Sequence, residues 1–294
     1  MPTQHPTGLA LWVAGARPKT LPAAVVPVAV GTAAVADDVF TLWRAAAAMV
    51  VAVALQIATN YANDYSDGIR GTDDDRVGPL RLVGSGAASS SSVKKAMLGS
   101  FAVAGLVGLA LSIAVNPWLL VVGAASIAAG WFYTGGSTPY GYLGLGEVFV
   151  FIFFGVVATV GSAYVQTESL SGVAAVLSVP VGVFATALLV INNLRDRIGD
   201  AEAGKRTLAV RLGDGPTRWI YVGSMAGAFA LIAVVALTTG RAPLLLALFG
   251  VVTAIPALRT VRSGAVGRSL IPVLEATGRT QLVAGLGMTL GLVL

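Results

Sequence analysis

Cysteine is absent from the sequence, and histidine occurs only once, as His5. The absence of cysteine excludes disulfide bonds, thiolate metal sites and thiol chemistry. His5 belongs to a polar N-terminal tail, where a solvated side chain is the simplest interpretation. No small-residue cleavage site follows an apolar core in that tail, so we expect no cleavable signal peptide.

Charged residues are also scarce. They make up 11% of the 294 residues, whereas hydrophobic residues make up 56%. Soluble domains contain about a quarter charged residues, and a soluble chain of this composition would expose too much apolar surface to stay dispersed. Apolar runs recur along the sequence, and roughly 20 apolar residues allow a helix to cross the hydrocarbon core of a bilayer. The composition therefore predicts an all-α, polytopic membrane protein.

Nine apolar runs predict nine transmembrane helices. We expect a single transmembrane domain over residues 1–294, made of two four-helix halves and a ninth helix, with cytoplasmic cap loops and no soluble domain. The predicted helices cover approximately residues 21–36, 41–61, 97–115, 117–134, 145–165, 172–191, 217–238, 242–259 and 279–294. The long polar connectors are residues 62–96, 135–144, 192–216 and 260–278.

The basic residues are distributed unevenly between the two sides of these helices. The net charge is +5, and most of the 19 lysines and arginines lie near the N-terminus or in the long connectors. The positive-inside rule assigns such segments to the cytoplasm. We therefore expect the N-terminus and the long loops to face the cytoplasm of a cell membrane. The basic excess is then a topology signal, and no nucleic-acid partner is expected.

A polar motif occurs twice, at the ends of the second and sixth predicted helices. The first motif is Asn60–Asp67 and the second is Asn192–Asp200, and both contain Asn-x3-Asp. An even number of predicted crossings separates the two motifs, so both emerge on the same face of the membrane. Internal repeats of this kind in membrane proteins place a shared site at their interface.

Each motif arranges carboxylates along one face of a helix end, because residues three or four positions apart share a face. The carboxylates are Asp64 and Asp67 in the first motif, and Asp196 and Asp200 in the second. Carboxylates brought together at one membrane depth raise each other's pKa, and a divalent cation relieves that repulsion. Hard oxygen ligands without histidine or cysteine favour Mg²⁺. The accompanying amides, which are candidates for substrate binding, are Asn60, Asn63, Asn192 and Asn193.

Basic residues follow both motifs. Arg76 and Arg81 come after the first motif, and Lys205 and Arg206 come after the second. Arginine and lysine bind phosphate oxygens, and Mg²⁺ held by few carboxylates keeps open positions for the same oxygens. This combination suits the ionisation of an allylic diphosphate, because a metal ion neutralises the leaving group as the C–O bond breaks.

A carbocation formed in this way needs a dry cavity and is stabilised by aromatic faces. The aromatic residues near 131–133 and 149–154 are candidates to line such a cavity, although packing is the commoner role of aromatic side chains. Glu147 lies within an apolar stretch and is a further candidate for the site. The other cytoplasmic arginines, such as Arg259, are interpreted as topology determinants only.

Several blocks of the sequence resemble the UbiA-type intramembrane aromatic prenyltransferases. The glycine-rich block after the fourth predicted helix and the Gly-Lys-Arg-Thr run are similar to the naphthoate branch of that family, the 1,4-dihydroxy-2-naphthoate polyprenyltransferases of menaquinone synthesis. The blocks are Ala16–Pro22, Asn60–Asp67, Gly78–Val83, Tyr133–Gly136, Pro139–Tyr142, Gly144–Glu147, Asn192–Asp196 and Gly204–Gly213.

The resemblance implies transfer of a polyprenyl group from an all-trans polyprenyl diphosphate to 1,4-dihydroxy-2-naphthoate. Carbon dioxide and diphosphate are lost, demethylmenaquinol forms, and Mg²⁺ is the cofactor of an active site that faces the cytoplasm. The motif aspartates would bind the metal, Lys205 would take part in catalysis, and Tyr133 would contact substrates. Arg17 and Lys19 would bind either the diphosphate or the carboxylate of the acceptor.

One position departs from the family pattern, Asn-x3-Asp-x3-Asp. The first two positions match Asn63 and Asp67, but the third is Gly71. Asp64 or Asp73 is expected to supply the missing carboxylate.

Two other interpretations compete with this one. A related prenyltransferase that acts on 4-hydroxybenzoate or another aromatic acceptor would carry the same motifs. A membrane transporter would also combine internal repeats with intramembrane acids. Transporters usually place such charges near the bilayer midplane, whereas these acids cluster at the predicted helix ends beside basic loops.

Overall fold

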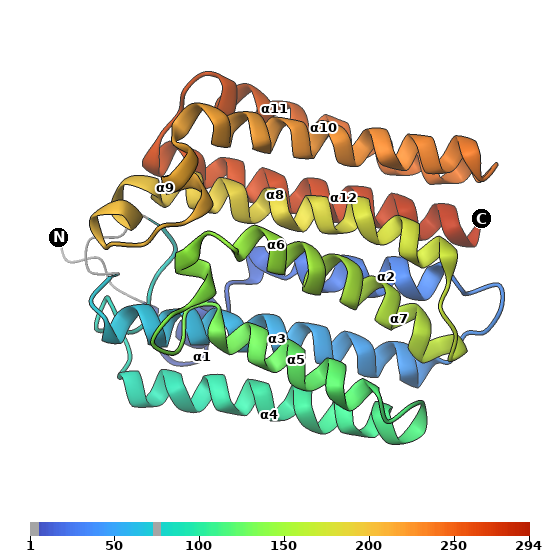
Figure 1. Ribbon diagram of the computed structural model, residues 1–294, viewed down its shortest axis with the longest axis horizontal. Coiled ribbons are helices and arrows are strands. Elements are labelled where there is room, and N and C mark those ends of the chain that lie inside the picture. Colours follow the sequence, from blue (N-terminus) through green and yellow to red (C-terminus); the bar gives the residue numbers. More distant parts are fainter. Residues whose placement is uncertain (1–5, 73–77) are drawn as a thin grey trace.

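The protein is a bundle of long, roughly aligned helices (Figure 1). The computed structural model describes residues 6–72 and 78–294, and every regular element within those ranges is helical. Asp73 and Arg76, two of the predicted site residues, lie outside the described residues. The long helices are α3 (Leu42–Ile69), α4 (Ser90–Ala114), α8 (Gly172–Glu202), α10 (Asp214–Thr238) and α12 (Ile271–Val293).

Shorter helices complete the bundle and its loops. In the first half these are α1 (Gly8–Ala16), η1 (Pro18–Thr20), α2 (Pro22–Ala33), α5 (Leu119–Phe132), η2 (Tyr140–Leu143), α6 (Gly146–Val150), η3 (Phe151–Val157) and α7 (Ala158–Thr167). In the second half they are α9 (Leu208–Leu212), η4 (Ala242–Phe249), α11 (Gly250–Arg262) and η5 (Gly267–Leu270).

The membrane character predicted from composition is confirmed. Among the described residues, six helical stretches are long and apolar enough to cross a membrane: Leu42–Ile69, Ser90–Ala114, Gly146–Thr167, Gly172–Glu202, Asp214–Thr238 and Ala242–Arg262. The apolar helices Pro22–Ala33 and Leu119–Phe132 are shorter. The chain is therefore a multi-pass membrane protein, and a total of nine crossings remains a prediction.

The last helix begins earlier than its apolar pattern predicts. We expected a helix over residues 279–294, but α12 starts at Ile271. Its first half contains Glu275, Arg279 and Gln281, which lower the local hydropathy. A prediction based on runs of apolar residues therefore places the start of the helix too late. Gln281 is nevertheless buried, because α12 packs inside the bundle.

Three apolar clusters hold the helices together. The largest joins α2, α8, α10, α11 and α12, and the second lies where α3 and α4 pack against α1. The third joins α2, α3, α4 and α7. Close helix contacts depend on small residues, as is usual in membranes. A Cβ atom at Gly291 of α12, for example, would lie 2.4 Å from the carbonyl oxygen of Pro243 in η4.

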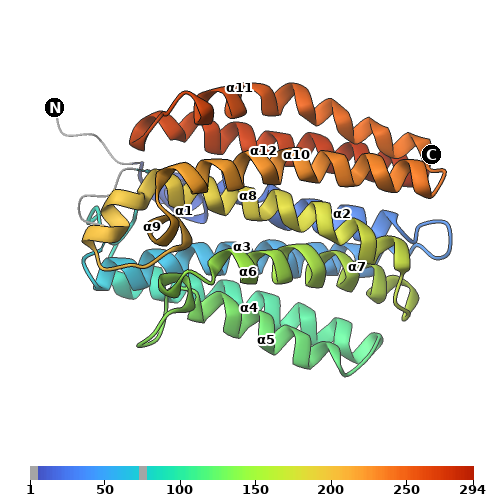
Figure 2. The same ribbon diagram turned by 45° about the horizontal axis from the view of Figure 1, so that its top comes forward.

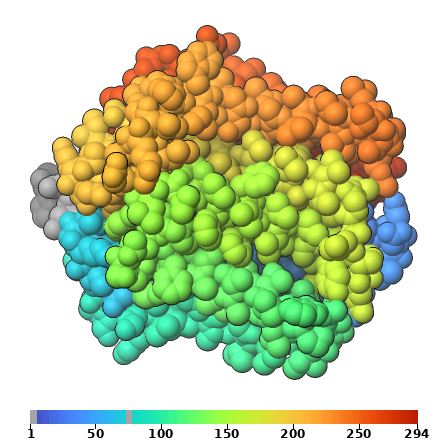
Figure 3. Space-filling view, in the orientation of Figure 1, coloured from blue at the N-terminus to red at the C-terminus, as the bar shows by residue number. Residues whose placement is uncertain are grey.

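The helix α5 packs much more loosely than its neighbours. Ala129 is the one buried residue among the positions Leu119–Phe132. The space-filling view shows a hollow between α5 and α7, with blue N-terminal atoms visible at its floor (Figure 3). Residues of both helices, including Gly123 of α5 and Gly161 of α7, line the large cavity described below.

The helices α6 and α7 form one continuous rod (Figure 2), and the segment between them, η3, is π-helical. Such segments are rare and occur frequently at functional sites. Its Gly155 lies against Gly182 of α8 so closely that a Cβ atom at Gly155 would lie 2.5 Å from the Cα of Gly182. This backbone contact fixes η3 on α8 and sets the direction of the phenylalanines that flank Gly155.

Candidate active site

A cavity of about 340 Å³ begins among the two polar motifs and continues between the helices. Its volume lies within the range of roughly 300–1,000 Å³ that is usual for small-molecule sites. Its polar lining includes Asn60, Asn63, Asp67, Arg81, Asn192, Asn193, Asp200 and Lys205. Its apolar lining includes Val51, Leu55, Leu111, Val122, Phe149, Phe153, Phe154 and Val157.

The two motifs meet at a buried group of charges. The Nζ atom of Lys205 lies 3.2 Å from Oδ2 of Asp67 and 3.9 Å from Oδ1 of Asp200. Nη2 of Arg81 lies 3.8 Å from the same oxygen of Asp67. All four residues are less than a tenth exposed. The structure therefore brings the two motifs together with Arg81 and Lys205, as the sequence predicts.

Tyr142 joins this group, although sequence reasoning gave it no role. Its hydroxyl donates a hydrogen bond of 2.5 Å to Oδ1 of Asp67, and its ring centroid lies 4.8 Å from Nζ of Lys205. Burial, followed by the charge of Asp67, raises the pKa of the Tyr142 phenol above its ordinary value. The phenol therefore stays protonated and holds one oxygen of Asp67. The only available signal was its place in the block Pro139–Tyr142 that carried the family resemblance.

Asp64 has a different environment from Asp67. Its Oδ2 accepts a hydrogen bond from the backbone N–H of Leu82 at 2.7 Å, and its Oδ1 accepts one from Val83 at 2.9 Å. Asp64 is fully buried and is not among the residues that line the cavity. This geometry favours a positioning role, in which Asp64 holds the segment that carries Arg81, over the predicted metal-ligand role.

Asp196 faces a buried arginine. Nε and Nη2 of Arg195 donate to its two carboxylate oxygens at 2.7 and 2.6 Å, and Nη2 also donates to Oδ1 of Asn192 at 2.9 Å. Gly78 covers the guanidinium, since a Cβ atom there would lie 3.2 Å from Nη2 of Arg195. Arg195 therefore connects the second motif to the loop after the first. Sequence reasoning missed this role, although Arg195 directly precedes the motif aspartate.

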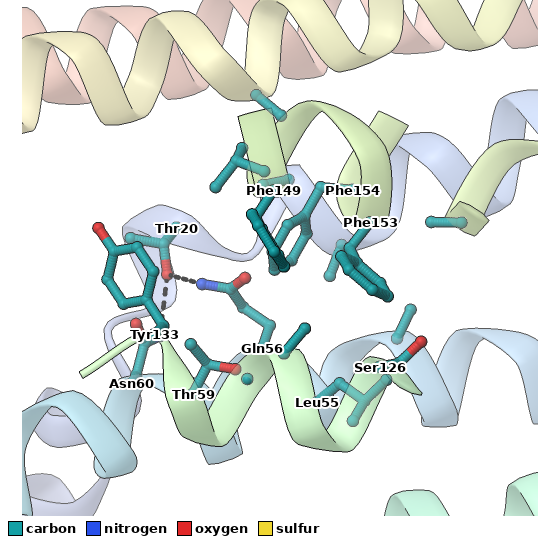
Figure 4. Close-up of a pocket in the computed structure, with 18 of the residues that line it drawn as sticks. Thr20, Leu55, Gln56, Thr59, Asn60, Ser126, Tyr133, Phe149, Phe153 and Phe154 are labelled. Carbon is teal, nitrogen blue, oxygen red and sulfur yellow. Dashed lines mark hydrogen bonds between the residues drawn. The ribbon is translucent and has the colours of Figure 1, made fainter. Parts of the chain in front are cut away.

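Three polar side chains join α3 to the turn between α1 and α2 (Figure 4). Nε2 of Gln56 donates to Oγ1 of Thr20 at 2.9 Å, and Nδ2 of Asn60 donates to the same oxygen at 3.0 Å. Asn60 also donates to the carbonyl oxygen of Ala16 at 2.9 Å. Asn60, a predicted substrate-binding residue, thus lines the cavity and supports the turn at the same time.

The predicted pair Arg17 and Lys19 separates. Arg17 lines the cavity, whereas the ammonium of Lys19 lies 2.5 Å from Glu275 with 69% of the lysine side chain exposed. Arg206 is also exposed and does not line the cavity. Its backbone N–H instead donates to the carbonyl oxygen of Tyr142 at 2.9 Å, which fixes the loop beside Lys205.

The remaining predicted residues lie around the cavity wall. Asn63 accepts a hydrogen bond from the hydroxyl of Thr134 at 2.9 Å, and Asn193 donates to Oε1 of Glu147 at 2.9 Å. Glu147 is buried behind Asn193 and does not line the cavity itself. Tyr133 lines the cavity, and its ring lies 5.5 Å from that of Tyr140 in an edge-to-face arrangement.

Aromatic rings form one wall of the cavity. Tyr140 stacks on Phe149 with 4.0 Å between the ring centroids, and Phe149 stacks on Phe153 at 6.1 Å. The rings of Phe149, Phe153 and Phe154 face Leu55 and Gln56 across the cavity (Figure 4). Aromatic faces stabilise cations in a dry site, so this wall suits a carbocation formed beside the charged group.

The donor set can accept a magnesium ion only together with a ligand. In the described parts of the chain, no three acidic, histidine or cysteine side chains come together as a metal-binding group. Asp67 and Asp200 are the motif carboxylates that line the cavity. Mg²⁺ is usually held by one or two carboxylates plus waters and substrate phosphates. These residues therefore fit a magnesium ion that arrives with, or is completed by, a phosphorylated substrate.

Comparison with known proteins agrees with this chemistry. Residues 24–268 match the UbiA prenyltransferase family. A 1,4-dihydroxy-2-naphthoate octaprenyltransferase from Mycobacterium tuberculosis is 52% identical over 283 residues, which cover 95% of each chain. A UbiA homolog from Aeropyrum pernix has the same fold, with a TM-score of 0.72, 18% identity and coverage of 90% of this chain and 96% of that one. A UbiA homolog from Archaeoglobus fulgidus, bound to GPP and Mg²⁺, has a TM-score of 0.69, 15% identity and coverage of 96% and 99%.

Proposed function

The chain belongs to the UbiA prenyltransferase family, and we propose that it transfers a polyprenyl group from an all-trans polyprenyl diphosphate to 1,4-dihydroxy-2-naphthoate. Carbon dioxide and diphosphate are lost, and demethylmenaquinol forms, which is a step of menaquinone synthesis. The observation that carries the proposal is one cavity with a charged group at Asp67 and Lys205 and an aromatic wall at Phe149 and Phe153. The match of 52% identity over nearly the whole chain supports the naphthoate as acceptor.

The charged group binds the diphosphate of the donor. Lys205 and Arg81 supply fixed positive charge beside Asp67, and the diphosphate brings several negative charges that these cations offset. Asp67 and Asp200 would hold a Mg²⁺ ion, which would supply Lewis-acid stabilisation of the leaving group. Asp196, Arg76 and Asp73 remain proposed members of this metal and diphosphate site.

The rest of the cavity receives the prenyl carbons and the acceptor. The rings of Phe149 and Phe153 give a dry, polarisable surface for the allylic cation. Holding the naphthoate against this surface converts a bimolecular encounter into a positioned attack, which is the main contribution that the protein can make for an already nucleophilic ring. Asn60, Asn63, Asn192 and Asn193 offer neutral hydrogen-bonding groups to orient the two substrates.

The activity is tested with purified protein in detergent or vesicles. Incubation with a prenyl diphosphate, 1,4-dihydroxy-2-naphthoate and Mg²⁺ should yield the decarboxylated, prenylated quinol, identified by mass analysis of the lipid extract. Competition with 4-hydroxybenzoate tests the second candidate, a sister activity with the same motifs. Preferential prenylation of 4-hydroxybenzoate would reassign the acceptor while leaving the donor chemistry in place.

The orientation in the membrane is part of the proposal. We propose nine crossings in a single domain, with the N-terminus, the motif loops and the active site on the cytoplasmic side of the cell membrane. Because the chain has no cysteine, a single cysteine at Asn116 or Thr167 is a clean topology probe. Both positions should react with an impermeant thiol reagent from outside the cell. Protection of both positions would overturn the assignment.

A further inference from the structure

Arg17 has an unusual backbone conformation at the edge of the cavity. It follows the last residue of α1 and has a φ angle of 53°, in the left-handed region that residues other than glycine rarely adopt. Three hydrogen bonds hold it there. Its N–H donates to the carbonyl of Ala14 at 3.1 Å, and its carbonyl accepts from the backbone N–H and from Oγ1 of Thr20, each at 2.9 Å. Strained residues of this kind cluster at ligand sites.

Arg17 is half-buried, and part of its guanidinium is enclosed without a hydrogen-bond partner among the described residues. Its Nε and Nη2 atoms are shielded from solvent, and neither has a hydrogen-bond partner among the described residues. Enclosed N–H groups of a guanidinium that lack an acceptor are unfavourable. Lys19, two residues later, shows the contrast, since it is exposed and paired with Glu275. The environment of Arg17 is therefore incomplete until an anion enters the cavity that it lines.

The neighbours of Arg17 indicate which anion this is. The diphosphate of the donor is already assigned to two other cations, Lys205 and Arg81, which lie beside Asp67. Arg17 instead lies beside Thr20, whose hydroxyl accepts hydrogen bonds from the neutral amides of Gln56 and Asn60. A planar guanidinium with two available N–H groups matches a carboxylate in a bidentate manner.

From these observations we propose that Arg17 binds the carboxylate of the aromatic acceptor and thereby determines its specificity. The proposal rests on the proposed function. With the carboxylate at Arg17, the ring lies between the amides of α3 and the aromatic wall at Phe149 and Phe153 (Figure 4). Arg17 thus binds the carboxylate of the aromatic acceptor at one side of the cavity, and Lys205 and Arg81 bind the diphosphate of the donor at the other.

The test removes the contact from each partner in turn. Wild type, Arg17→Gln and Arg17→Lys are assayed with 1,4-dihydroxy-2-naphthoate, and 1,4-dihydroxynaphthalene, which has the same ring without the carboxylate, serves as a competitive inhibitor. Arg17→Gln should raise the KM for the naphthoate about 10- to 150-fold, as expected for the loss of a charge-assisted contact. The KM for the prenyl diphosphate should change much less. The inhibitor should bind wild type and Arg17→Gln equally well.

Arg17→Lys keeps the positive charge but cannot donate two parallel hydrogen bonds to a carboxylate. Its KM for the naphthoate should therefore lie between the values for wild type and Arg17→Gln. Lys95→Gln, which neutralises an exposed cation of α4, is the matched control and should leave both KM values unchanged. A rise confined to the KM for the prenyl diphosphate would assign Arg17 to the donor and overturn the proposal. Unchanged discrimination between the naphthoate and its carboxyl-free analogue in Arg17→Gln would also overturn it. Inactive wild type would instead refute the proposed function itself.

Discussion

Nζ of Lys205 and Oδ2 of Asp67 lie 3.2 Å apart, although they come from opposite halves of the chain. The two side chains are almost completely buried, so neither charge is stabilised by water. An ion pair in such a site stabilises the fold little. Its value lies in keeping a cation and a metal ligand together where a diphosphate binds.

Replacement of Lys205 by Gln should therefore weaken donor binding. We expect the apparent KM for the prenyl diphosphate to rise about 10- to 150-fold, because one charge-assisted contact contributes about 1.5–3 kcal/mol. The KM for the naphthoate should rise less. Steady-state assays in which each substrate is varied separately measure both values, and unchanged donor kinetics in a well-inserted variant would argue against the assignment.

Magnesium removal should abolish turnover. Excess EDTA is expected to stop the reaction, and added Mg²⁺ should restore it, because Asp67 and Asp200 need a cation to hold the leaving diphosphate. Asp67→Asn and Asp200→Asn should each lower kcat/KM by a factor of at least about 100, since each removes a metal contact that stabilises developing charge. Full activity in EDTA would contradict the metal assignment.

Asp64→Asn should behave differently from Asp67→Asn. Both oxygens of Asp64 accept backbone N–H groups of Leu82 and Val83, and an asparagine can keep only one of these hydrogen bonds. We expect a lower Tm in detergent and a higher KM for the prenyl diphosphate, because the segment with Arg81 becomes misplaced. The Mg²⁺ concentration that gives half-maximal activity should stay close to that of wild type. A large shift in that concentration would show that Asp64 is a metal ligand.

The sequence was sufficient to predict the membrane bundle and the convergence of the two motifs. Apolar periodicity locates helices, and the shared spacing of Asn63–Asp67 and Asn192–Asp196 implies two equivalent helix ends. The sequence assigned a metal-ligand role to Asp64 as well as to Asp67, because the environment of Asp64 depends on which way the 78–83 segment folds back. The roles of Tyr142 and Arg195 were missed for the same reason, since each is defined by a partner that only the folded chain provides.

The Tyr142 hydroxyl should make stability decline at alkaline pH. Burial and the charge of Asp67 raise its pKa in the folded state, so the folded protein holds this proton more tightly than the unfolded chain, whose tyrosines titrate near pH 10. The stabilisation is fully present below about pH 10 and is lost as the pH rises through the folded pKa. Tyr142→Phe should flatten this decline in thermal unfolding scans between neutral and alkaline pH. An identical pH dependence in both proteins would contradict the role given to this proton.

The contact between Gly155 and Gly182 should tolerate no side chain. In Gly155→Ala the new methyl group would lie 2.5 Å from the Cα of Gly182 and 3.2 Å from the carbonyl oxygen of Ser178, both backbone atoms that cannot rotate away. Such overpacking costs about 1–3 kcal/mol, and we expect a lower Tm in detergent. Because η3 would move off α8, the stacked rings of Phe149 and Phe153 should also shift and turnover should fall.

Gly161→Ala is the matched control for this effect. Gly161 lies in the next turns of the same rod, but a Cβ atom there meets no other atom within 4 Å. Its Tm should equal or slightly exceed that of wild type, because alanine favours the helix over glycine by about 1 kcal/mol. If both substitutions lowered the Tm equally, loss of glycine flexibility in the rod, and not the approach to Gly182, would explain the result. A drop confined to Gly155→Ala would show that the π-helical segment is held in place by its backbone contact with α8.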